Sequence, residues 1–296
     1  MSYTIGVDIG ATKTNFVLLK DLRVIKAKRT VTLKTKKKLI EAVEENIQKL
    51  ISDINKSKIL GIGIGVTGPL NEKRNLMLNP PNQKYLKLCP LAKIIENDLR
   101  KNFKLKTIMD NDVNCFTLGE ALLGAGKEVK TVFGVTLGTG VGGGIVINKK
   151  LYRGNFGSAG EVGHMTIKYD GHKCSCGNIG CFEEYSSGRF FKRKGVDPKE
   201  LAKIARNGDE KALEVFKEYG KYLGIGLSNT INLLDPEMIV LGGGIANTHS
   251  LFIKETKKEM KQRITSPIAR KNLKIKKTRL GGLATAIGAA LLCQKK

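Results

Sequence analysis

Apolar runs separated by short polar turns dominate the first part of the chain. Tyr3–Asp8 and Asn15–Leu19 are apolar and are joined by a glycine-bearing turn, which predicts a strand hairpin, and Arg23–Leu33 predicts a third strand. Between residues 39 and 54 apolar positions recur every three or four residues, as on one face of an amphipathic helix of about four turns. Ile59–Val66 then predicts a buried strand that ends in a turn at Thr67-Gly68-Pro69.

Strands and helices mix in the remainder of the chain. A strand, a glycine turn and a second strand are predicted over 131–148, and an irregular stretch over 152–188. Mixed strands and helices indicate an α/β fold. The strand–glycine turn–strand pattern at 5–19 recurs loosely at 132–147, which predicts two lobes with a boundary near Asp110. Further helices are expected at 91–102, 113–123, 199–207, 210–233 with a break near Gly220, 251–264 and 283–293, and further strands at 106–110, 238–241 and 273–276.

The chain of 296 residues has a net charge of +25, from 52 lysines and arginines against 27 acidic residues. The lysines are dispersed and do not alternate with stacking aromatic residues, so a solvated lysine-rich surface is favoured over a nucleic-acid site, with general attraction for phosphate as a second interpretation. No apolar stretch approaches the ~20 residues of a membrane span, and no signal peptide is recognised. We therefore expect a cytoplasmic protein without a membrane or nucleic-acid partner.

Three of the six cysteines fall within eight residues, at Cys174, Cys176 and Cys181, and His164 precedes them. One imidazole and three thiolates form a closed tetrahedral site for a structural Zn²⁺. The surrounding region has few apolar residues and needs such a crosslink. His172 is a competing ligand, which we interpret as a surface residue.

Two glycine turns could hold phosphate. Asp8–Thr14 fits neither the Walker loop nor the dinucleotide fingerprint, because the lysine spacing is wrong and a strand follows where a helix should. Backbone N–H groups at Gly10 and the hydroxyls of Thr12 and Thr14 could face an anion, with Asp8 holding a hydrated Mg²⁺. The second turn runs from Gly138 through Thr139 and Gly140 to Gly144. An ordinary hairpin is the alternative for both.

Three further groups of residues could bind or react. The predicted strand 238–241 runs into Gly242, Gly243 and Gly244, where a flat base could lie against the backbone or a plain turn could form. Asn111-Asp112 starts a helix, either as an N-cap or with Asp112 as a general base. Glu161 and Glu183 flank the cysteines as hydroxyl acceptors or as solvated surface acids.

Together these segments resemble the ROK family of sugar kinases and sugar-responsive repressors. The most specific part is Gly160-Glu161-Val162-Gly163-His164 followed by Cys174–Glu183, and Asp8–Thr14, Asn111-Asp112, Gly138–Gly144 and Asp235–Gly244 stand in the family order. The resemblance implies a two-lobed actin-like ATPase fold, related to ribonuclease H, with a cleft between the lobes. We assign residues 1–110 plus 281–296 to a small lobe and 111–280 to a large lobe.

The resemblance also implies roles for single residues. Asp112 would take the proton from the attacking sugar hydroxyl, and His164 would give one nitrogen to zinc and the other to sugar. The remaining hydroxyls would meet Asn111, Glu161 and Glu183, with Gly68 and Asn155 lining the pocket. Phosphates would meet Thr12, Lys13, Thr139 and Gly140, and Gly242–Gly244 would back the adenine ring of ATP. The chain departs from the family pattern at Ala11, Thr67 and Asn71.

The favoured activity is transfer of phosphate from ATP to glucose, giving glucose 6-phosphate. A kinase for an N-acetylhexosamine, such as N-acetylmannosamine or N-acetylglucosamine, is the alternative. A DNA-binding regulator is disfavoured, because family repressors carry a helix-turn-helix segment ahead of the first strand, which here begins at residue 3. The family resemblance implies a homo-oligomer, a dimer or tetramer.

Overall fold

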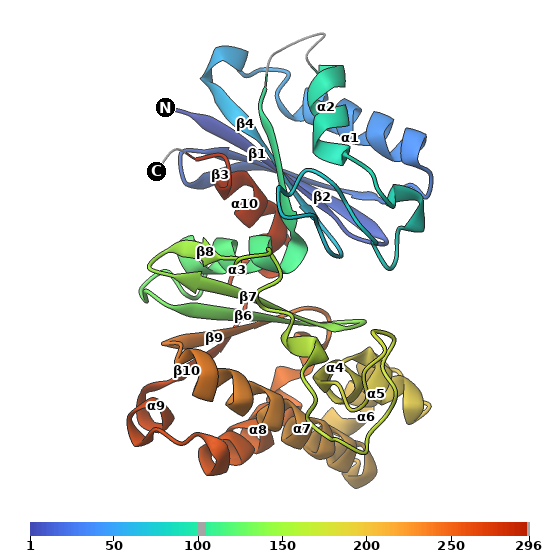
Figure 1. Ribbon diagram of the computed structural model, residues 1–296, viewed down its shortest axis with the longest axis vertical. Helices are drawn as coiled ribbons and strands as arrows, with labels where there is room; N and C mark the ends of the chain where they lie inside the picture. Colours follow the sequence, from blue (N-terminus) through green and yellow to red (C-terminus); the bar gives the residue numbers. More distant parts are fainter. Residues whose placement is uncertain (100–104, 295–296) are drawn as a thin grey trace. The chain divides into compact units, whose positions relative to one another are not determined.

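The computed structural model describes residues 1–99 and 105–294. Two five-stranded sheets with helices confirm the predicted α/β class (Figure 1). The contacts divide the chain into two compact units. The first is Met1–Glu128 with Gly144–Ala159 and Arg279–Lys296, and the second is Val129–Gly143 with Gly160–Thr278. Residues 111–128, 144–159 and 279–280, which we assigned to the large lobe from the sequence, group with the first unit in this division.

The sheet of the first unit has the strand order β3-β2-β1-β4-β5. The strands β1, β2 and β3 are antiparallel neighbours, whereas β1, β4 and β5 run parallel. The carboxyl ends of β1, β4 and β5 therefore meet at one edge of the sheet. Their bounds are β1 Tyr3–Ile9, β2 Lys13–Lys20, β3 Arg23–Val31, β4 Ile59–Val66 and β5 Thr107–Asn111.

Two pairs of helices cover this sheet. Ile5, Val7 and Ile9 of β1 belong to the apolar core that also holds the buried face of α1, whereas a Cβ at Gly6 would lie 1.9 Å from the backbone oxygen of Ala286 in α10. Because side chains alternate along a strand, α1 and α10 lie on opposite faces (Figure 1). The helices are α1 Lys36–Leu50, α2 Leu91–Leu99, α3 Asp112–Leu122 and α10 Ala284–Leu291, with short 3-10 turns at Lys56–Lys58, Lys84–Leu86 and Gly281–Leu283.

The alternation of isoleucine and glycine in β4 has the same cause. Ile62, Ile64 and Val66 pack into the core on the α1 face. A Cβ at Gly63 would lie 1.7 Å from the backbone oxygen of Ala289, so only glycine lets α10 rest directly on the strand.

The second sheet has the order β10-β9-β6-β7-β8, and the division between the units falls within β7. Strands β10, β9 and β6 run parallel. The bounds are β6 Val132–Leu137, β7 Val141–Ile147, β8 Lys150–Tyr152, β9 Met238–Gly242 and β10 Lys274–Lys277. The second unit also contains α4 Phe182–Ser186, α5 Gly188–Arg193, α6 Pro198–Arg206, α7 Glu210–Leu234, α8 His249–Arg263 and α9 Pro267–Asn272, with 3-10 turns at Val162–His164 and Ile245–Thr248.

Two expectations about helices need adjustment. The break expected near Gly220 is wrong, because α7 is one continuous helix that packs against α8 at this glycine. The last positions of the helix expected at 91–102 lie outside the described residues. Within the described part of the chain, no helix has the length and apolar character to cross a membrane.

Candidate active site and metal centre

The turn after β1 presents its most polar residues to solvent. Gly10 N donates to the backbone oxygen of Lys13 at 3.1 Å and closes the turn. Thr12 and Lys13 are exposed, as a phosphate contact requires. Thr14 is buried, and its hydroxyl lies 2.9 Å from the Thr32 hydroxyl. In this structure Thr14 thus supports the turn from inside rather than facing an anion, because its buried hydroxyl is engaged with Thr32.

Asp8, near the carboxyl end of β1, is held by a polar chain that the sequence did not reveal. Asn15 Nδ2 donates to Asp8 Oδ2 at 2.8 Å, and Arg29 Nε donates to Asn15 Oδ1 at 2.7 Å. The pKa of Asp8 is raised to about 7, chiefly by burial and in addition by the negative charge of Asp112, whereas the Asn15 hydrogen bond and the charge of Arg29 act in the opposite direction. A carboxylate that is costly to ionise alone is well suited to a bound cation, which supplies the missing positive charge.

Asn111 and Asp112 begin α3 at the end of β5. Asn111 Oδ1 accepts from Val113 N at 2.8 Å and Asn114 N at 3.3 Å, so this residue is the N-cap of the helix. Thr67 Oγ1 donates to Asp112 Oδ2 at 3.2 Å. The threonine that departs from the family pattern therefore contacts the candidate base directly. By contrast, the Asn71 side chain closes its own turn through Leu76 N.

Gly68 and Asn155, the two predicted pocket residues, also belong to the first unit. Gly68 has φ of +98°, and a Cβ there would lie 2.9 Å from Pro80 Cα, so the position requires glycine. Asn111 Nδ2 donates to the Gly68 oxygen at 3.4 Å, which joins this turn to the start of α3. Asn155 is exposed.

Asp110 is a residue that sequence reasoning missed. Its side chain is 1% exposed, and its Oδ2 accepts from Arg153 Nε at 2.8 Å while Arg74 Nε lies 3.8 Å away. Its Oδ1 accepts from Asn114 Nδ2 and from the backbone N–H of residue 111. This buried carboxylate fixes the backbone immediately before Asp112. The one sequence signal for this role of Asp110 is its place in a run of acidic and amide residues, 110–112.

The other two glycine turns lie together in the second unit. Strands β6 and β9 are parallel neighbours, and Gly138–Gly140 and Gly242–Gly244 follow their carboxyl ends. Gly243 has φ of +84°, and a Cβ there would lie 2.3 Å from the Leu137 oxygen. Ligands of α/β proteins bind at such carboxyl edges. The structure thus brings these two predicted nucleotide-binding turns together.

The four predicted zinc ligands converge within the second unit. His164 Nδ1 lies 3.8 Å from Cys174 Sγ, and Cys176 Sγ lies 3.6 Å from Cys181 Sγ. All four ligand atoms lie within 4.8 Å of one another. The sulfur separation is far above the ~2.05 Å of a disulfide, and the cysteines are free. His172 instead stacks on Tyr185, with ring centroids 5.4 Å apart.

These separations fit a tetrahedral zinc ion. Bond lengths of about 2.3 Å to sulfur and 2.1 Å to nitrogen place two sulfurs about 3.8 Å apart and a sulfur and a nitrogen about 3.6 Å apart. The cluster thus has the donor set and the spacing for Zn²⁺. The backbone supports it, because Cys174 N donates to the Asn178 oxygen and Gly177 N to the Cys174 oxygen.

The acidic residues around this cluster differ in their surroundings. Glu161 is exposed, and its Oε2 lies 3.9 Å from His164 Nε2, the nitrogen that faces away from the cysteines. Glu183 is buried, lies 3.4 Å from Cys174 Sγ, and pairs with Arg189 at 3.2 Å. A Cβ at Gly140 would lie 2.6 Å from Glu183 Oε2, which places this carboxylate beside the second glycine turn.

An ion-pair network missed by sequence reasoning anchors this region. Glu184 is buried and pairs with Arg189 and, at 2.7 Å, with Arg193. Because Arg189 also contacts Glu183, the start of α4 is held to α5 next to the cysteine cluster. Buried carboxylates require such partners.

The fold and these sites define an α/β protein with several glycine turns at strand ends and a Cys₃His cluster. The chain matches the ROK family over residues 4–296 and belongs to that family. It is 30% identical to a glucokinase of Streptomyces coelicolor, covering 100% of this chain and 98% of the relative. It is 31% identical to an N-acetyl-D-glucosamine kinase of Photobacterium profundum, covering 98% and 99%. It is 28% identical to a xylose repressor of Bacillus subtilis, covering 97% of this chain and 75% of the repressor.

A solved structure supports the same grouping. A ROK family glucokinase from Streptomyces griseus in complex with glucose and AMPPNP matches with a TM-score of 0.82 and 31% identity, covering 98% of this chain and 99% of that chain. The predicted actin-like ATPase fold is thereby confirmed.

Proposed function

We propose that this protein transfers the terminal phosphoryl group of ATP to a hexose, with glucose as the favoured acceptor and glucose 6-phosphate as the product. The observation that carries the proposal is the carboxylate of Asp112, which accepts a hydrogen bond from Thr67 at the start of α3. The similarity to glucokinases over the whole chain supports it.

Asp112 is the proposed general base. It would accept the proton of the attacking hydroxyl. Asp110 would hold the backbone that carries it. The proposed contacts with the other sugar hydroxyls are Gly68, Asn111, Asn155, Glu161, His164 and Glu183.

The glycine turns are the proposed nucleotide contacts. Thr12, Lys13, Thr139 and the backbone of Gly10, Gly138 and Gly140 would meet phosphates, with Thr14 supporting the first turn. Gly242–Gly244 would back the adenine ring. Asp8 would hold the hydrated Mg²⁺, which supplies neutralisation of phosphate charge when bound.

The Cys₃His cluster is the proposed structural Zn²⁺ site. His164 Nδ1, Cys174, Cys176 and Cys181 would be the ligands. With Nδ1 turned to the sulfurs, the Nε2 of His164 points toward Glu161, so metal binding would orient the imidazole for a sugar hydroxyl.

An N-acetylhexosamine kinase is the second candidate, favoured by the similarity to an N-acetyl-D-glucosamine kinase at the same level of identity. A sugar-responsive regulator is the third, favoured by the similarity to xylose repressors. The two kinases share one mechanism and differ only in the acceptor.

A coupled ADP-release assay separates these candidates. Purified zinc-loaded protein is given ATP, Mg²⁺ and one of glucose, mannose, N-acetylglucosamine, N-acetylmannosamine or xylose. Glucose should give the highest kcat/KM, and Asp112→Ala serves as the inactive control. A preference for an acetylated sugar selects the second candidate, and no turnover with any sugar refutes the kinase proposal.

A further inference from the structure

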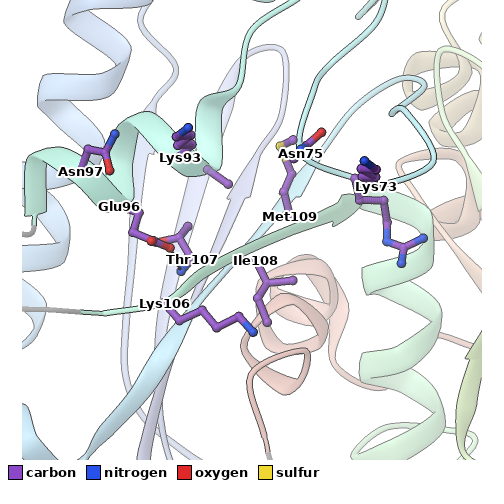
Figure 2. Close-up of a pocket in the computed structure, with 11 residues that line it drawn as sticks. Lys73, Asn75, Lys93, Glu96, Asn97, Lys106, Thr107, Ile108 and Met109 are labelled. Carbon is purple, nitrogen blue, oxygen red and sulfur yellow. Dashed lines mark hydrogen bonds between the residues drawn. The ribbon is translucent and has the colours of Figure 1, made fainter.

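A pocket lined by several charged side chains lies in the first unit, along the edge strand β5. It is a cavity of about 450 Å³, within the range of small-molecule sites, ~300–1,000 Å³. Figure 2 shows Thr107, Ile108 and Met109 of β5 between Lys93, Glu96 and Asn97 of α2 and the loop that carries Lys73 and Asn75. None of the proposed kinase residues lines it.

The pocket carries an excess of positive charge. Lys73, Arg74, Lys93 and Lys106 line it, and Glu96 is the acidic residue among its described lining. Glu96 is already engaged, because its Oε2 accepts from Thr107 N at 2.8 Å. Within residues 1–99 and 105–294, the three lysines form no ion pair with a carboxylate. Among the described lining residues, four cationic side chains thus stand against the one carboxylate of Glu96.

Arg74 adds to this excess. It shares the Oδ2 of Asp110 with Arg153, so two guanidinium groups are balanced by one carboxylate. Burial and the repulsion from Arg153 both lower the pKa of Arg74. An anion in the pocket would relieve that repulsion. Arg74 also has φ of +48°, a conformation that non-glycine residues seldom adopt.

We propose that this pocket binds a small phosphate-bearing anion, held by Lys73, Lys93 and Lys106, with Arg74 at its inner wall. A phosphate dianion matches several ammonium groups that approach from different directions better than a single carboxylate does. Free phosphate and a sugar phosphate share this chemistry.

The test measures binding rather than turnover, so its outcome is independent of the proposed kinase activity. Inorganic phosphate is titrated into the protein by calorimetry at constant ionic strength, and glucose 6-phosphate is titrated in a second series. The pocket variant is Lys93→Gln/Lys106→Gln, and the matched control is Lys58→Gln/Lys87→Gln, which removes two exposed lysines of the same unit outside the pocket.

The pocket variant should bind phosphate at least about tenfold more weakly than the wild type, with the control unchanged. Tighter binding of glucose 6-phosphate than of phosphate would assign the site to a sugar phosphate, and the reverse order to free phosphate. Binding at the glycine turns would persist in both variants. Equal weakening in both variants, or no weakening in the pocket variant, overturns the proposal. If the double variant fails to fold, Lys106→Gln alone must still weaken binding at least threefold.

Discussion

Replacing Asp8 by asparagine should stabilise the protein at neutral and higher pH. Burial raises the pKa of Asp8 from its ordinary value of 3.8 to about 7. The folded protein therefore retains a proton that the unfolded chain loses. Below about pH 4 the Asp8 carboxyl is neutral in both the folded and the unfolded protein, so it does not lower the free energy of unfolding. Between pH 4 and 7 the free energy of unfolding falls as the pH rises, and above about pH 7 the cost is constant.

The magnitude follows from the size of the shift. Three pKa units correspond to roughly 4 kcal/mol, an upper limit, and the partial exposure of Asp8 reduces this to about 2 kcal/mol. Asp8→Asn keeps an oxygen to accept from Asn15 Nδ2 and removes the charge. The variant should melt roughly 3 °C above the wild type at pH 8 and at the same temperature at pH 4.

Differential scanning calorimetry across pH 4–8, without Mg²⁺ or nucleotide, measures this difference. Asp98→Asn, in α2 of the same unit, is the matched control for the loss of one carboxylate. The reasoning is refuted if the difference in melting temperature between the Asp8 variant and the wild type does not change with pH, or if the wild type melts above the variant at pH 8. With Mg²⁺ and AMPPNP added, the wild type should gain more than the variant, because Asp8 is the proposed cation partner.

Three further substitutions test other parts of the site. Asp112→Ala should lower kcat at least about 100-fold with zinc content unchanged, and near-normal turnover would exclude it as the base. Cys176→Ser should lower the zinc content from about one ion per chain and reduce the melting temperature, whereas the control Cys293→Ser should retain the metal. Equal zinc contents in the two variants would refute the proposed zinc site. Asp110→Asn should cost about 2–3 kcal/mol in urea unfolding, because Arg74 and Arg153 lose their shared carboxylate, and a loss no larger than that of Asp98→Asn would contradict this role.

Local patterns predicted most of the elements and the Cys₃His cluster. The apolar period of 39–54 predicted α1, which the structure places at Lys36–Leu50, and the apolar run 59–66 is β4 with the same bounds. The four proposed zinc ligands lie within 18 residues, so residue type and spacing alone pointed to one site. The break expected near Gly220 failed because glycine there serves the close packing of α8 rather than a turn.

The amino-acid sequence by itself determined the α/β class, the glycine turns, the candidate base and the cysteine set, since each depends on residues close together along the chain. Only the tertiary structure decided what surrounds Asp8, Asp110 and the pocket beside β5. Arg153 reaches Asp110 across 43 positions, and Thr67 reaches Asp112 across 45. Such pairs are set by which strands become neighbours in the sheet and by the burial that makes an unpaired charge costly, and neither is visible in a local pattern.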